Sequence, residues 1–147
     1  MAKLQLDMEM ECDFRLLGIG SHVGSHRLAW ELNRIFGWDL KFDRVITSYN
    51  KNNDTKHIVL TFIDREEGLD VALILNRVPG GVLASGASSL DYLLKLGIDF
   101  LDNHDVISEI RRSNLVTMVT KIDPERSGAL GELYDLDIIK IDNKENE

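Results

Sequence analysis

Glycines cluster early in the chain, in the segment GIGSHVG at residues 18–24. Glycines let a backbone approach a phosphate closely, and the N-terminus of a following helix attracts the anion. The spacing G-x-G-x-x-x-G is one residue longer than the dinucleotide-binding fingerprint, and no Gly-Lys-Ser/Thr occurs. An anion-binding turn using Gly18, Gly20 and Gly24 is therefore one interpretation, and a tight turn without a ligand is the other.

Two histidines, His22 and His26, stand four residues apart, a spacing at which two imidazoles share one helix face. Two ligands are too few for a metal site, and no Glu follows the first His as it does in zinc proteases. The acidic run at residues 99–109 lacks the glycine and final Glu of a calcium loop. Ser21 and Ser25 lack an activating geometry with these histidines. We expect no catalytic residue, no metal and no cofactor.

Several residues have the types that anchor protein interfaces. Arginine and tryptophan dominate binding energy at such interfaces, and Arg27, Trp30 and Glu31 lie close together in the sequence. Packing in the core is the alternative fate of Trp30. The candidate binding residues are Ser21, Ser25, Arg27, Trp30, Glu31, Asp91 and Tyr92.

The elements that must position these residues begin with a buried strand at residues 14–20. A helix follows, with Ser21 or Ser25 as its cap, apolar residues at helical spacing, and Gly37 at its end. Residues 40–48 form the next strand and residues 49–55 a polar loop. Two β-rich segments, 57–64 and 69–77, are joined by four turn-forming residues, which predicts an antiparallel hairpin.

The second half of the chain repeats this mixture of strand and helix. We expect a strand at 90–96, a helix that Asp102 or Asn103 caps and that ends near residues 113–114, and a strand at 115–122. Tyr134, Leu136 and Ile138 alternate with acids and predict a last edge strand. The fold class is α+β, with a mostly antiparallel sheet of five to seven strands and two main helices packed on one face.

Domain organisation and location follow from length and composition. Residues 1–13 alternate acidic and apolar residues as an acidic arm or edge strand, residues 14–141 form a single domain, and 142–147 form a disordered tail. The 25 acids against 17 basic residues give a net charge of −8, which opposes nucleic-acid binding. No apolar run is long enough for a membrane span. Cys12 has no partner and no apolar leader follows Met1, so we expect a cytoplasmic protein.

Three segments carry a resemblance to a known family. They are Phe14-Arg15-Leu16-Leu17-Gly18-Ile19 with Ser21, then Arg27-Leu28-Ala29-Trp30-Glu31-Leu32-Asn33, then Leu90-Asp91-Tyr92-Leu93-Leu94-Lys95-Leu96. Together they resemble the family named for its IPExxxVDY motif, over about residues 12–122. Residues 90–92 match the VDY part, and Ala84-Ser85-Gly86 stands where the family has IPE. The resemblance implies a small bacterial cytoplasmic protein and carries over no activity or catalytic residue.

Two functions remain open. The first is a non-enzymatic protein-binding or regulatory domain that presents a sheet face, a strand edge or the region of Arg27, Trp30 and Glu31 to a partner. A homodimer is a further option. The second is a domain that binds a small molecule or anion, such as a nucleotide or metabolite, at the glycine-rich turn, and that acts as an enzyme if chemistry follows binding.

Overall fold

Six strands form one antiparallel sheet in a computed structural model that describes residues 13–49 and 54–136. The strand order is β2-β3-β4-β7-β1-β8, and every neighbouring pair is antiparallel. The predicted α+β class and the predicted hairpin are confirmed. The strands are β1 (Phe14–Gly20), β2 (Lys41–Tyr49), β3 (Asp54–Asp64), β4 (Leu69–Leu75), β7 (Tyr92–Gly97) and β8 (Met118–Ile122).

The first helix, α2 (Ser25–Phe36), buries an apolar stripe at helical spacing. It ends at Gly37, whose φ of 73° lies in the left-handed region and whose N–H donates to the Asn33 carbonyl at 2.8 Å. The prediction that Ser21 or Ser25 caps this helix is wrong. Gly24 occupies the cap position, and no side chain caps the helix there.

The predicted second helix is divided into two. Helix α3 (Ile98–Asn103) follows β7 directly, and α4 (Val106–Arg111) begins after Asp105. The prediction that Asp102 or Asn103 caps this helix is wrong, because both residues belong to α3.

The end of the described chain is helical over residues 130–136, so the predicted edge strand is wrong for Tyr134 and Leu136. Ala129, Leu133 and Leu136 are spaced by four and three residues and are all buried, which is the pattern of one helix face. Ile138, the tail at 142–147 and all of the predicted arm at 1–13 except Asp13 lie outside the described residues.

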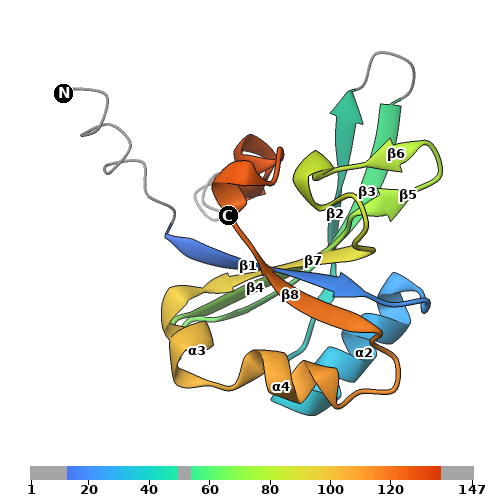
Figure 1. Ribbon diagram of the computed structural model, residues 1–147. Helices are drawn as coiled ribbons and strands as arrows, with labels where there is room; N and C mark the ends of the chain where they lie inside the picture. The colour runs from blue at the N-terminus through green and yellow to red at the C-terminus, as the bar shows by residue number, and fades with distance from the viewer. Residues whose placement is uncertain (1–12, 50–53, 137–147) are drawn as a thin grey trace, which may run out of the picture.

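Both faces of the sheet are covered (Figure 1). The core on one face is shared with α2, α3 and α4, which agrees with the predicted packing of the two main helices. On the other face, residues 83–90 and the helix at 130–136 enclose a second core. The short helix η1 (Ser85–Ala87) contributes Ala87 to this core. The remaining short elements are β5 (Arg77–Val78), β6 (Gly81–Val82) and η2 (Pro124–Arg126). Among the described helices, none has the length and apolar character needed to cross a membrane.

Candidate functional site

The chain turns sharply after β1, and Ser21 holds this turn in place. Its hydroxyl donates to the Leu115 carbonyl at 2.5 Å and accepts from the Val23 N–H at 3.4 Å. The Thr117 N–H donates to the Gly20 carbonyl at 2.8 Å. Ser21 is only 4% exposed, so it connects β1 to the segment that leads into β8.

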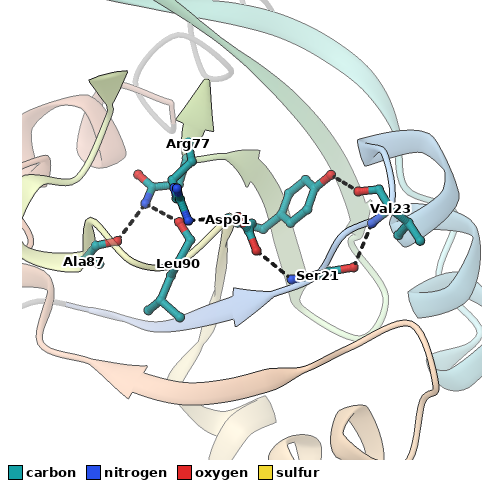
Figure 2. A network of polar contacts seen from close by, with 8 residues as sticks. Ser21, Val23, Arg77, Ala87, Leu90 and Asp91 are labelled. Atoms are coloured by element: carbon teal, nitrogen blue, oxygen red, sulfur yellow. Dashed lines mark hydrogen bonds and ion pairs between the residues drawn. The ribbon is translucent and has the colours of Figure 1, made fainter. Parts of the chain in front are cut away.

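Two residues at the start of β7 contact the same turn: Tyr92, the first residue of the strand, and Asp91, which directly precedes it (Figure 2 shows Asp91). The Ser21 N–H donates to Asp91 Oδ2 at 2.8 Å, and the Tyr92 hydroxyl donates to the Val23 carbonyl at 2.6 Å. Burial, helped by the nearby Asp91 carboxylate, raises the pKa of Tyr92 to about 12, so the hydroxyl remains a donor. The structure therefore brings together three of the predicted site residues, Ser21, Asp91 and Tyr92.

Asn76 holds the backbone that leads to Asp91 in place through hydrogen bonds, and the sequence analysis did not identify it. Its amide nitrogen donates to the carbonyls of Ala87 and Leu90 at 2.9 and 2.8 Å (Figure 2). Its oxygen accepts from the Ala84 N–H at 2.8 Å. Asn76 is fully buried. Its sequence position could have indicated this role, because a polar amide that directly follows the apolar run at residues 71–75 is expected to be buried and hydrogen-bonded.

A polar cavity of about 660 Å³ opens beside the turn. Arg77 lies on its wall, with Nη1 3.6 Å from Asp91 Oδ1, and its side chain is 53% exposed. Guanidinium, imidazole and hydroxyl groups make this a surface rich in hydrogen-bond donors. The lining residues are Gly20, His22, Arg77, Val78, Pro79, Ser89, Asp91, Thr117 and Met118.

The three glycines of the predicted anion-binding turn do not form one loop. Gly18 and Gly20 lie within β1, and none of the three has a positive φ. A Cβ at Gly18 would overlap the side chains of Leu90 and Ile122, and one at Gly20 would lie 2.8 Å from Thr117 Oγ1. Gly24, at the cap of α2, has open space around it. Two of the glycines therefore serve close packing in the sheet.

The candidate residues on α2 do not share one surface. Arg27 and Trp30 are exposed, whereas Glu31 is buried between α2 and the segment after α4. Glu31 accepts hydrogen bonds from Arg34 Nε at 2.7 Å and from the Ser113 hydroxyl. The Arg34 bond, followed by the Ser113 bond, lowers the pKa of Glu31. Ser25 is also buried, in the first turn of the helix.

Edge strand β2 exposes large apolar side chains, which the sequence interpretation did not identify. Phe42, Val45 and Tyr49 are 56%, 44% and 80% exposed. Their partners on β3 are Leu60, Ile58 and Asp54, which alternate along that strand, so the three side chains share one face of the sheet. The sequence gives no indication of this, because a strand that buries its apolar face in the core shows the same alternation of apolar and polar residues.

The described histidines do not form a metal centre. Within residues 13–49 and 54–136, no group of three or more His, Cys, Asp or Glu side chains is placed to hold a metal ion. His22 and His26 are exposed, and His57 is fully buried.

Comparisons with known proteins leave the family open. No protein-family model matches the chain, and a search of curated proteins finds no match. The resemblance to the IPExxxVDY family therefore stays a prediction.

Proposed function

We propose that the protein is a non-enzymatic cytoplasmic binding module whose edge strand β2 receives an extended segment of a partner protein. The main observation in support is that Phe42, Val45 and Tyr49 are exposed on one face of an edge strand. We also propose that residues 14–141 act as one domain and that its relatives are the IPExxxVDY proteins.

An edge strand offers unpaired backbone donors and acceptors to an incoming strand. β2 is nine residues long, and its register shift falls between Phe42 and Arg44, near its start. From Arg44 to Tyr49 its pairing with β3 is regular. On the side where no described strand pairs with it, this stretch can form backbone hydrogen bonds, while its apolar side chains contact alternate residues of the partner.

The partner is a different protein and not a second copy of this chain. Each copy carries a net charge of −8, and like charges on two copies oppose their association. A segment of another protein that is neutral or basic meets no such repulsion.

Capture from native lysate with the tagged protein, combined with two lysine variants, tests the proposal. We expect one stoichiometric partner, lost with Val45→Lys and kept with Ile63→Lys, since Ile63 is an exposed apolar residue on the interior strand β3. Hydrogen exchange of the purified complex should show new protection concentrated in β2 amides.

Equal capture by both variants, or protection away from β2, would contradict the proposal, as would the absence of any stoichiometric partner. Light scattering should give the mass of one chain for the protein alone. Twice that mass, reverted by Val45→Lys, would identify a second copy as the occupant and contradict the choice of a different protein.

A second candidate function is the binding of a small anion in the polar cavity beside Ser21. The exposed Arg77 guanidinium, with the hydroxyls of Ser89 and Thr117, favours it. Thermal-shift measurements with inorganic phosphate and with mononucleotides test this candidate. A ligand at 100 times its dissociation constant stabilises the fold by about 2.7 kcal/mol. The stabilisation should disappear in Arg77→Gln and persist in Arg65→Gln, an exposed arginine of the β3–β4 turn.

A further inference from the structure

A second cavity, of about 780 Å³, lies at the end of the sheet where the β3–β4 turn, the start of α3 and the α2–β2 connection meet. Neither the β2 edge nor the polar cavity beside Ser21 uses it. Its lining combines aromatic rings with carboxylates.

The aromatic part of the wall is a connected set of rings. The rings of Phe36 and Trp38 are stacked, with centroids 4.4 Å apart and planes at 21°. Phe100 lies 5.6 Å from Trp38 and stacks on His104 at 4.1 Å. All four residues line the cavity. Aromatic faces carry negative potential, and tryptophan attracts cations most strongly.

The other part of the wall is acidic. Asp13, Asp64, Glu67 and Asp99 line the cavity, and no Lys or Arg of residues 13–49 and 54–136 does. Among the described residues, none of these four carboxylates forms an ion pair. The local charge therefore has the same sign as the net charge of −8, and both attract cations.

Trp38 provides a further observation. It is 6% exposed, and its indole N–H has no hydrogen-bond acceptor among the described residues. Unsatisfied buried donors are rare in native proteins, and each calls for an explanation. Here the donor belongs to a residue of the cavity wall. It calls for an acceptor, which a cationic group does not supply but which an oxygen beside it, such as the hydroxyl of choline, would.

We propose that this cavity binds an organic cation, a substituted ammonium or guanidinium group that the aromatic faces contact and the carboxylates neutralise. An inorganic ion would gain little from the aromatic rings, and an anion would be repelled by the carboxylates. The cation can belong to a free small molecule or to a side chain of a bound protein, and the chemistry of recognition is the same. The inference does not depend on the β2 edge.

Tryptophan fluorescence can test the proposal directly. The chain has two tryptophans, and Trp30 is 62% exposed, so Trp30→Phe leaves Trp38 as the reporter at little cost to the fold. Choline, butylammonium and butylguanidinium are titrated into this protein. Choline is compared with its neutral tert-butyl analogue, in which carbon replaces the quaternary nitrogen. We expect saturable changes with at least one cation, and binding of choline about tenfold tighter than that of its neutral analogue.

Variants then separate the acidic rim from the aromatic wall. Glu67→Gln, made in the Trp30→Phe background, should weaken binding of the cation severalfold, whereas Glu66→Gln should leave it unchanged. Glu66 is exposed in the same turn and does not line the cavity. Phe100→Leu should weaken binding about tenfold through loss of a ring. If Phe100→Leu fails to fold, the comparison of Glu67→Gln with Glu66→Gln still tests the proposal.

Three results would overturn the proposal. They are the absence of saturable binding with all three cations, equal affinity for choline and its neutral analogue, and equal effects of Glu67→Gln and Glu66→Gln. If free cations bind and the captured β2 partner does not compete with them, the source is a small molecule. Competition would show that a side chain of the partner occupies the cavity. Failure of the cation titration leaves the β2 proposal untouched, because the two surfaces are measured by different readouts.

Discussion

Asn76 binds three backbone groups of the segment at residues 84–90 through one buried side chain. Asn76→Ala would leave the Leu90 carbonyl and the Ala84 N–H without their partner, while the Ala87 carbonyl would keep its bond from the Leu90 N–H. Each unsatisfied buried group costs about 1–3 kcal/mol. We expect a loss of about 3 kcal/mol or more in the free energy of unfolding, measured by urea denaturation. Asn114→Ala, at an exposed position, should change it by less than about 0.5 kcal/mol. Similar losses in the two variants would contradict this role of Asn76.

His57 makes stability depend on pH. It is fully buried, with Nδ1 2.9 Å from the Leu75 carbonyl and Nε2 2.8 Å from the Thr55 hydroxyl. Burial lowers the pKa of His57, an effect that the nearby carbonyls partly offset. Because the unfolded imidazole takes up its proton at higher pH than the folded one, stability is full above about pH 6.5 and falls as pH decreases towards the folded pKa.

The wild type should therefore lose free energy of unfolding between about pH 7.5 and pH 5.5, by at most about 1.4 kcal/mol per pH unit from this group. His57→Gln should lose less over the same interval, and the exposed His26→Gln should behave as the wild type does. Glu31 has a lowered pKa, so its contribution to stability also falls as pH decreases. That loss occurs at more acidic pH, below the ordinary pKa range of a glutamate. An unchanged pH dependence in His57→Gln would show that another group is responsible.

At the scale of residues, the sequence named Ser21, Asp91 and Tyr92 among seven candidate binding residues without predicting that they meet. The structure joins them around one turn through hydrogen bonds that span 69 or 70 positions of the chain. Long-range pairing of this kind has no local pattern. Glu31 shows the opposite error, since a charged residue beside an exposed tryptophan is ordinarily solvated, yet Ser113 and Arg34 satisfy it in the interior.

Helix ends provide the clearest prediction at the scale of elements. Gly37 adopts a left-handed φ of 73°, where a Cβ is strained, so Gly37→Ala should destabilise the protein by about 1 kcal/mol. Gly131 lies in the helix at 130–136, has an ordinary φ, and has open space at its Cβ position. Gly131→Ala should stabilise the protein by about 0.5 kcal/mol. Thermal unfolding measures both changes, and shifts of the same sign in both variants would contradict the explanation.

Elements with strong local patterns were predicted correctly, and those without them were not. The β3–β4 hairpin and α2 combine periodic apolar residues with clear turn or end residues. The segment at 130–136 was misread because Tyr134 and Leu136 alternate with acids. The competing helical spacing of Ala129, Leu133 and Leu136 prevails because it buries all three against the sheet.

The second core gives the prediction that concerns the whole molecule. Leu133 is fully buried between the helix at 130–136 and the sheet. Leu133→Ala should cost about 3 kcal/mol of unfolding free energy through lost burial and a residual cavity. Asp135→Ala, at an exposed position of the same helix, should cost less than about 0.5 kcal/mol. A tolerated Leu133→Ala would mean that this layer contributes little to the stability of the sheet.

The sequence predicted the sheet but not that both of its faces are covered. Two helices were expected on one face, and the residues that cover the other face lie mostly in loops, η1 and a short helix. Small residues such as Ala84, Ala87 and Ala129 contribute to this layer, and they leave little hydrophobic periodicity to detect.

The position of β1 between β7 and β8 has a consequence for synthesis of the chain. A ribosome releases β1 first, yet β7 and β8 are translated much later, while β2, β3 and β4 can pair as soon as they emerge. Until then the nascent chain presents Leu16, Leu17 and Ile19, all buried in the finished fold, as an unpaired strand. We therefore expect this segment to be a binding site for a chaperone during translation.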